Sequence, residues 1–369
     1  MDQTDLLWRH LARVAARYPS PHNTQPLRLR VDDPRTATIL FDRTAALPAH
    51  PLGVLFGHVT VGVYLECLSV AAHASGHVLD VDLVEGPVRP LDAGQPDDPG
   101  QPGPEAPAGR WQRVARVSLV DVGTRVDDLD PGLLERRRTS RLPYDGRDVA
   151  PYVLRRVADE CVAAGHRFAT SGHAPTVAEV VALDQEALFD DLRTPLVRHE
   201  LARWVRTSER AARASRDGFS PRTLGTPGPL LRAVLTHPRF WLGGPAAALT
   251  RRVRRGGSRG TPRVAWLRGP LRDEPDAVAA GRLLLRVWLV LTEEGVAVHP
   301  YGSLVTGPRA LPRFHRLVGE LGQDGLGTWM ILRLGHSAEP PRSLRRPLED
   351  MLVLPAGPAP VGIAIEGAR

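Results

Sequence analysis

The sequence contains no lysine, so the 48 residues that count as lysine or arginine are all arginine, and they outweigh the acidic residues to give a net charge of +7. The absence of lysine excludes a P-loop, whose lysine reaches the nucleotide phosphates, and it excludes Schiff-base attachment of a cofactor such as pyridoxal phosphate. An anion site in this chain must therefore use arginine side chains, backbone N–H groups or helix N-termini.

Cysteine is scarce as well. The two cysteines, Cys67 and Cys161, lie in unrelated apolar segments, and the chain has neither a CxxC pair nor a Cys/His cluster. A free cysteine in an apolar helix behaves as a small buried hydrophobic residue. The sequence therefore predicts no metal site, and both cysteines are expected in the core.

Long uninterrupted apolar runs are also missing. The stretch at 229–249 contains Arg232, His237 and Arg239, which argues against a membrane span. Residues 1–5 are acidic, unlike a signal peptide, so we expect a cytoplasmic protein without membrane contact. The 369 residues, 42% of them hydrophobic, are enough for two domains with a real core.

The spacing of the apolar residues predicts both helices and strands, an α+β fold. Helical periodicity covers residues 5–17, 62–76, 152–164, 177–207 and 280–292. Strand-like patterns cover residues 27–31, 36–41, 78–84, 113–119 and 329–334. Two segments lack both patterns. Residues 92–110 are expected as a flexible loop, and residues 214–265 as a lid-like excursion of irregular chain.

An internal repeat is visible in the chain. Residues 62–76 align without gaps on residues 281–295, and each segment is an apolar helix bracketed by glycines and followed by a short apolar strand. The helix at 5–17 similarly resembles the helix at 152–164. Two matches in the same order favour a duplication of one folding unit.

A polar turn follows the first expected helix. Its polar side chains are those of Ser20, His22, Asn23 and Gln25. Flanking prolines fix the backbone, so these side chains have little entropy left to lose and can present donors and acceptors to a planar polar ligand. The alternative is a plain helix-to-strand turn with an Asx cap, and the turn alone favours that alternative.

An arginine-rich segment opens the second half of the chain. It contains Arg136, Arg137, Arg138, Thr139, Ser140 and Arg141, just before a proline. Arginine offers a fork of donors that suits phosphate and carbonyl oxygens. The alternative is a solvated basic run, which is common in an arginine-rich protein.

Two later segments carry side chains of similar kinds. The second repeat helix is followed by a turn that contains His299, Tyr301, Gly302 and Ser303. Gly302 would permit a close backbone approach to a ligand, whereas a histidine in such a turn is more often a satisfied core residue than a catalytic base. Arg345 and Arg346 follow the last expected strand, where a charged tail is the alternative.

Together these segments resemble the nitroreductase-like family of FMN proteins. Residues 20–26 resemble its SxxNxQP segment, with Leu27 in place of the usual tryptophan, and residues 137–141 resemble its RxSxR motif. A single-lobed member carries RxSxR first, whereas here it comes second and neither motif is repeated. This order resembles the fused, Acg-type branch. It implies two tandem nitroreductase-like lobes, 1–125 and 126–369, that form an intrachain pseudo-dimer with one FMN at the seam.

The resemblance also implies a role for each residue. Arg137 and Thr139 would face the FMN phosphate and ribityl chain, with backbone contacts from Arg138. Arg141 would lie near flavin N1 and the C2 carbonyl, where a cation stabilises the reduced anion. Other flavin contacts would come from Pro19, Ser20, His22, Asn23, Gln25, Tyr301, Gly302 and Ser303, and further phosphate contacts from Arg345 and Arg346. His22 and Tyr301 are the candidates for a proton donor.

A flavin site implies an FMN-dependent oxidoreductase, which would transfer hydride or electrons from NAD(P)H or a metabolite to a nitroaromatic, a quinone or a natural-product intermediate. The alternative is a catalytically quiet FMN-binding or storage protein, with residues 214–265 closed over the flavin. A third interpretation takes the arginines between residues 251 and 263 as a nucleic-acid or anionic-membrane surface, but no interleaved aromatics support base stacking. We therefore expect a small-molecule substrate, no nucleic acid, no membrane, and a monomer or homodimer.

Overall fold

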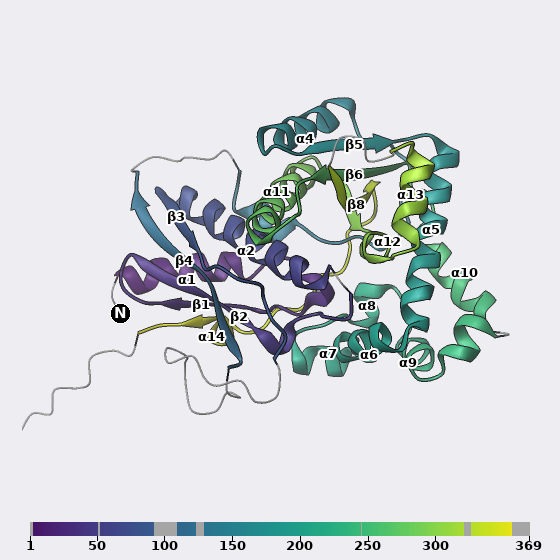
Figure 1. The fold of residues 1–369 in the computed structure, drawn as a ribbon, viewed down its shortest axis with the longest axis horizontal. Coiled ribbons are helices and arrows are strands. Elements are labelled where there is room, and N and C mark those ends of the chain that lie inside the picture. The colour runs from purple at the N-terminus through teal and green to yellow at the C-terminus, as the bar shows by residue number, and fades with distance from the viewer. Residues whose placement is uncertain are drawn as a thin grey trace, which may run out of the picture.

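The chain folds into two lobes, each built from one β-sheet and one long central helix (Figure 1). The structure is a computed structural model that describes residues 3–50, 52–91, 109–122, 129–244, 246–320 and 326–355. Most of the loop expected at 92–110 lies outside the described residues. The boundary predicted between residues 125 and 126 also falls outside them, so it stays a prediction.

The first lobe contains a five-stranded sheet with the order β3-β4-β2-β1-β9. Its strands are β1 (Leu27–Val31), β2 (Thr36–Asp42), β3 (His77–Leu83), β4 (Trp111–Asp121) and β9 (Leu352–Val353). Neighbouring strands are antiparallel, except that β9 is parallel to β1. Helices α1 (Gln3–Ala15) and α2 (Gly53–Ala74) pack in the same lobe, with two short turns, η1 (Pro21–Asn23) and η2 (Arg43–Ala45).

The second lobe repeats this topology. Its sheet has the order β5-β6-β8-β7, with β5 (Arg167–Ser171), β6 (Arg263–Gly269), β7 (Ala297–Pro300) and β8 (Gly327–Gly335), all antiparallel. Helices α4 (Pro151–Ala163) and α11 (Glu274–Glu293) take the places of α1 and α2. The order β5-β6-β8-β7 reproduces β1-β2-β4-β3, so the two lobes share the topology that the repeat predicts.

The two central helices cross at the glycines that the repeat aligns. A Cβ atom on Gly62 would lie 1.9 Å from the Val278 carbonyl oxygen, and one on Gly281 would lie 2.0 Å from the Val59 carbonyl oxygen. Only glycine permits this approach, because no side chain could fit between the backbones. The helices α2 and α11 therefore form the seam between the lobes.

Helix α2 is apolar on nearly all sides because it lies inside the molecule. By length and composition it could cross a membrane, but 78% of its most apolar window is buried. Its one acidic side chain, Glu66, is buried and pairs with Arg282 at 2.9 Å and with Arg286 at 3.0 Å, both on α11. Cys67 on the same helix and Cys161 on α4 are both buried, as expected.

A helical insertion separates β5 from β6. It contains α5 (Ala174–Arg193), α6 (Pro195–Trp204), α7 (Glu209–Ser215), α8 (Pro221–Leu224), α9 (Gly228–Thr236), the π-helical turn η3 (Arg239–Gly243) and α10 (Ala247–Gly257). The prediction of irregular chain over 214–265 was therefore wrong. Prolines and glycines break these helices into short pieces, which hides their periodicity, and the end of that range already belongs to β6.

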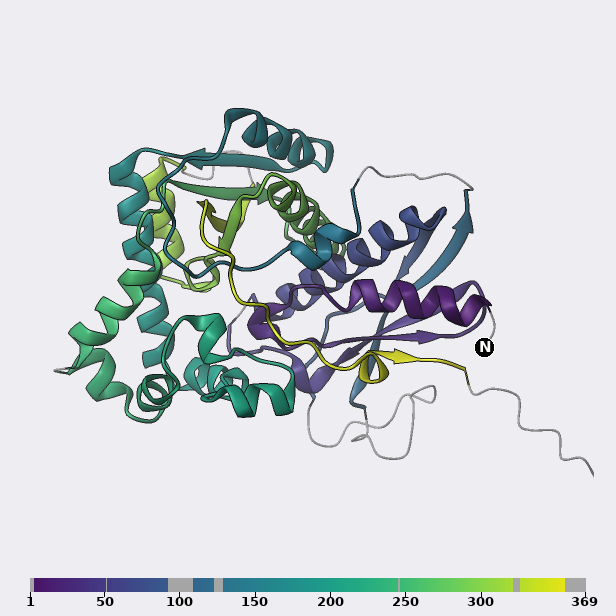
Figure 2. The same ribbon diagram turned by 180° about the vertical axis from the view of Figure 1, so that it is seen from behind.

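The C-terminal part of the chain crosses from the second lobe back to the first (Figure 2). After β8 it passes the polar turn at 20–26, forms α14 (Leu348–Met351), and adds β9 to the edge of β1. The remaining helices are α3 (Gly132–Arg136), α12 (Gly302–Thr306) and α13 (Ala310–Val318). This crossing brings residues 342–346 close to residues of both lobes.

Candidate functional site

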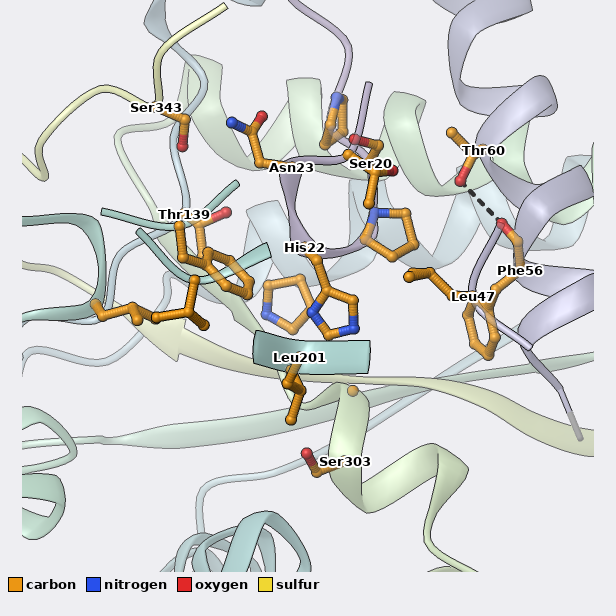
Figure 3. A pocket seen from close by; sticks show the side chains of 18 of the residues that line it. Ser20, His22, Asn23, Leu47, Phe56, Thr60, Thr139, Leu201, Ser303 and Ser343 are labelled. Carbon is orange, nitrogen blue, oxygen red and sulfur yellow. Dashed lines mark hydrogen bonds between the residues drawn. The ribbon is translucent and has the colours of Figure 1, made fainter. Parts of the chain in front are cut away.

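A cavity of about 450 Å³ lies between the two lobes and the insertion. Its volume falls within the range of roughly 300 to 1,000 Å³ that is typical of small-molecule sites. The turn at 19–26, the segment at 137–141, the helices α2 and α11, the insertion and the C-terminal crossing all contribute to its wall. Figure 3 shows His22 in the middle of the view, with Ser20, Thr139 and Leu201 around it.

The turn at 20–26 has an unusual backbone. His22, Asn23 and Gln25 have φ angles of 52°, 55° and 51°, in the left-handed region that residues other than glycine rarely adopt. Each such residue costs on the order of 1 kcal/mol or more, so the surroundings must hold it. The Gln25 N–H donates to Ser20 Oγ at 3.0 Å, and the Leu27 N–H donates to the Tyr18 hydroxyl at 3.0 Å.

Asn23 ties this turn to two distant segments. Its Nδ2 donates to the carbonyl oxygens of Gly218 at 3.0 Å and Leu344 at 3.1 Å, and its Oδ1 accepts from Arg345 Nη1 at 2.8 Å. The Gly218 N–H donates back to the Asn23 carbonyl oxygen at 3.0 Å. Asn23 lines the cavity, but its side chain is already used within the protein. It holds the insertion and the C-terminal crossing in place rather than facing a ligand.

Gln25 plays a similar part from outside the cavity. Its Nε2 donates to the Arg216 carbonyl oxygen at 3.0 Å, and its Oε1 accepts from the Arg346 N–H at 2.9 Å. Gln25 is buried and is absent from the cavity wall, so the structure does not place it as a flavin contact. Both carboxamides of the turn thus act on the protein's own segments.

Arg137, which is buried, and Arg345, which is partly buried, lie together in the cavity wall. Arg345 donates to the Asn23 side chain, to the carbonyl oxygen of Arg17 at 3.3 Å and to that of Tyr18 at 3.2 Å. Arg137 donates to the same Arg17 carbonyl oxygen at 3.2 Å, and its guanidinium carbon lies 4.6 Å from the centroid of the Trp288 ring. Both side chains line the cavity, and the Nε of each is buried without a hydrogen-bond partner.

The charged forms of both arginines are disfavoured in the fold. Burial, together with the charge of Arg345, lowers the pKa of Arg137 to about 9. Burial also lowers the pKa of Arg345, to about 10. Within the part of the chain that the structure describes, no carboxylate lies within ion-pair distance of either guanidinium. Two guanidiniums that donate to one carbonyl oxygen and lack a carboxylate partner are a candidate anion site.

Hydroxyl groups line the same cavity. Ser20, Thr139 and Ser343 all line the cavity. The segment at 137–141 runs beside β7, because the Ser140 N–H donates to the Val298 carbonyl oxygen at 2.9 Å. Ser20 and Thr139 belong to the two motifs, so the fold brings together segments that are more than one hundred residues apart in the sequence.

Three arginines near this site have partners in the protein. Arg138 lines the cavity and pairs with Glu339. Arg141 also lines it, with its guanidinium 4.9 Å from the Phe219 ring centroid. Arg346 does not line it: its guanidinium pairs with Asp217 at 3.0 Å. The structure therefore does not place Arg346 as a phosphate contact, because the carboxylate already neutralises it.

The turn after β7 contributes only part of what was expected. Gly302, Ser303 and His299 line the cavity, and so does Pro19 of the first lobe. Tyr301 is buried in the core of the second lobe and is absent from the cavity wall, with its N–H donating to the Ile331 carbonyl oxygen at 2.8 Å. Tyr301 is thus a core residue, and the structure does not place it as a flavin contact or a proton donor.

A group of titratable residues on the insertion side was not anticipated. His50, Asp191 and Glu200 line the cavity. His50 Nε2 lies 3.4 Å from Asp191 Oδ1, and this contact raises the pKa of His50. Glu200 accepts from the Ala49 N–H at 2.9 Å, and burial raises its pKa. No motif joins these residues in the sequence, because the insertion brings them together only in the fold.

His22 lies in the strained turn, with its side chain in the cavity wall, and we predict a pH effect from it. Burial lowers its pKa from 6.5 to about 4, so the unfolded chain binds the proton first as the pH falls. The stability contributed by the neutral side chain is present above pH 6.5 and is lost as the pH falls towards 4. His22→Asn keeps a residue that tolerates positive φ but does not titrate.

Over this pH window the wild type should lose up to about 3 kcal/mol of unfolding free energy relative to His22→Asn. Urea unfolding of both proteins at each pH measures the difference. Parallel pH profiles would show that His22 does not titrate as a buried neutral imidazole.

No protein-family model and no curated protein sequence matches the chain. Several solved structures, in contrast, do match the chain. A nitroreductase with bound FMN from Desulfitobacterium hafniense DCB-2 is 16% identical, with 59% of this chain and 95% of that chain covered and a TM-score of 0.34. The FMN-dependent nitroreductase NfnB from Mycobacterium smegmatis, in complex with NADPH, is 19% identical, with 59% and 94% covered and a TM-score of 0.35.

An iodotyrosine deiodinase bound to FMN and 3-iodo-L-tyrosine is 12% identical, with 58% of this chain and 94% of that chain covered and a TM-score of 0.35. In each pair this chain is the longer one. These three solved structures are two nitroreductases and a deiodinase, and each is described as binding or depending on FMN.

Proposed function

We propose that the chain binds FMN in the cavity between its lobes and acts as an FMN-dependent oxidoreductase. The pair of the buried Arg137 and the partly buried Arg345 carries the proposal, because two neighbouring guanidiniums without a carboxylate partner favour the binding of an anion. A phosphate monoester suits them, since its oxygens can accept from both forks at once. Arg137 belongs to the segment that resembles the RxSxR motif of the nitroreductase-like family, and Arg345 lies where the resemblance implies further phosphate contacts.

The rest of the cavity fits the remainder of this cofactor. Ser20, Thr139 and Ser343 offer hydroxyls for a ribityl chain, and Val59, Trp288 and Met330 are among the apolar residues that would flank a planar ring. FMN, when bound, would supply hydride and electron transfer between two small molecules that use the cavity in turn. The protein's part is then to position the reactants and to exclude water.

The purified protein should be yellow, or should take up FMN with one site per chain. It should then oxidise NADPH or NADH when a quinone or a nitroaromatic is added. Flavin fluorescence measures the binding, and nicotinamide absorbance measures the turnover. A colourless protein that leaves the fluorescence of added FMN unchanged would contradict the proposal.

One observation favours a second candidate function, a catalytically quiet FMN-binding protein. The insertion is fastened over the cavity by the Asn23–Gly218 hydrogen bonds and by the ion pair of Arg346 with Asp217. A fastened insertion could keep substrates from the ring while retaining the cofactor. FMN binding without oxidation of either nicotinamide, with every acceptor tried, would favour this candidate over the enzyme.

A further inference from the structure

The second half of the insertion carries an extreme charge bias. From Gly218 to Arg272 the chain contains eleven arginines and no aspartate or glutamate. This stretch alone exceeds the net charge of +7 for the whole chain, so the remainder is net acidic. The bias is therefore local to the second half of the insertion and the strand that follows it, and it is not a general property of the chain.

Most of these arginines are exposed and have no carboxylate partner. Arg263, Arg268 and Arg272 pair with acidic residues outside the stretch. Other arginines lie on α8, α9, η3 and α10 or just after α10, and they are exposed. Within the described residues, no carboxylate forms an ion pair with these arginines, which are Arg222, Arg232, Arg239, Arg252, Arg255 and Arg259. The charge of this cationic surface is therefore not neutralised by carboxylates of the described residues, and it is available to a binding partner.

Exposed apolar side chains lie within the same surface. Phe240 on η3 is 50% exposed and Leu249 on α10 is 51% exposed. The Thr250 hydroxyl donates to the Trp241 carbonyl oxygen at 3.0 Å, and this bond joins the residues next to Leu249 and Phe240. Both apolar side chains thus belong to one corner of the insertion.

Helix α10 places its side chains in two groups. Ala247 and Thr250 are buried and Val253 lines the cavity. Leu249, Arg252 and Arg255 are exposed and follow one another at a spacing of three residues, so they share the outward side. A helix with an arginine-rich outer side and protruding leucine and phenylalanine is typical of proteins that rest on a lipid surface.

We propose that the outer face of η3 and α10 docks onto anionic lipid headgroups. The arginines pair with the lipid phosphates, while Phe240 and Leu249 enter the boundary between headgroups and acyl chains. Nucleic acid fits less well, because a phosphate backbone offers no apolar partner for two exposed aliphatic and aromatic side chains. From the sequence alone we expected no membrane contact. The sequence does not reveal that Phe240 and Leu249 are exposed, because their exposure depends on the fold.

Docking would bring the cavity close to the lipid. The inner sides of α9 and α10 supply Leu231, Val234 and Val253 to the cavity wall, so these helices separate the cavity from the docking face. In Figure 1, α9 and α10 lie at the end of the molecule farthest from the sheet of the first lobe. The first lobe therefore does not cover the docking face.

The test is co-sedimentation of the full chain with vesicles of phosphatidylcholine, with and without phosphatidylglycerol. We expect at least about tenfold stronger binding to the vesicles that contain phosphatidylglycerol, with a loss at high salt. Charge reversal in Arg252→Glu/Arg255→Glu should remove at least about tenfold of that binding. Phe240→Ser/Leu249→Ser should weaken it at every salt concentration, because the apolar contribution is not screened.

Matched controls separate this surface from the general charge. Arg13→Glu/Arg155→Glu makes the same change in net charge on exposed arginines of α1 and α4 and should bind as the wild type does. Val162→Ser removes an exposed apolar side chain elsewhere. Equal binding to both kinds of vesicle, or an equal loss in the control pair, would overturn the proposal. Tight binding of duplex DNA that does not depend on Phe240 and Leu249 would overturn it in favour of a nucleic-acid surface.

Discussion

Arg137→Met should leave the cofactor-free protein as stable as the wild type, or more stable, while it weakens FMN binding about 10- to 100-fold. The pKa of Arg137 is lowered to about 9 by burial and by the charge of Arg345, which shows that this cation is unfavourable without an anion. Methionine can fill the apolar space beside Trp288 without that charge. A variant that binds FMN more weakly but unfolds less readily has lost a residue whose side chain binds the ligand and does not stabilise the fold.

Riboflavin provides the internal control, because it lacks the phosphate. The wild type should prefer FMN to riboflavin by at least about tenfold, and Arg137→Met should lose most of this preference. Arg136→Met changes the preceding arginine, which is exposed, and should alter neither affinity nor stability. Isothermal titration and urea unfolding measure the two quantities. An equal loss of affinity for both flavins would show that Arg137 acts on the protein rather than on the phosphate.

The sequence was most informative where local pattern and global fold agree. Strand β1 matches the alternating segment 27–31 residue for residue, and the aligned glycines at 62 and 281 lie at the crossing of the two central helices. These features depend on short-range alternation and on a repeat, both of which are visible in one dimension. The order of the two motifs predicted a site at the seam between the lobes, and both motif segments line one cavity.

What the sequence could not give was the use of each side chain. Asn23 and Gln25 were expected at the ligand, but both are occupied by backbone groups of residues 216–218 and 344–346. Arg346 was also expected at the ligand, but its guanidinium forms an ion pair with Asp217. These partners lie between 190 and 330 residues away in the chain, so no local pattern reports them.

The second half of the insertion was missed for a different reason. Its helices after α6 are short, and Pro221, Pro229 and Pro238 open or interrupt them, so the helical period never lasts long enough to be recognised. Strand β9 is only two residues long and pairs with β1 after the chain has crossed from one lobe to the other. Its position depends on tertiary contacts and not on strand propensity.

Gly281→Ala should destabilise the protein by about 3 kcal/mol or more, because the crossing of α2 and α11 has no room for one methyl group. The new Cβ would lie 2.0 Å from the Val59 carbonyl oxygen and 3.0 Å from the Gly62 Cα, both backbone atoms that move only with the whole helix. Relief requires the helices to separate. The lobes carry the two halves of the candidate site, so separation should also weaken FMN binding.

Gly256→Ala is the matched control, since Gly256 is also helical but a Cβ there meets nothing within 4 Å. This change should be neutral or stabilising by up to about 1 kcal/mol, as expected for alanine in place of glycine in a helix. Urea unfolding of both variants, with and without FMN, measures the difference. If Gly281→Ala unfolds at the same urea concentration as Gly256→Ala, then the close crossing of α2 and α11 does not hold the two lobes together.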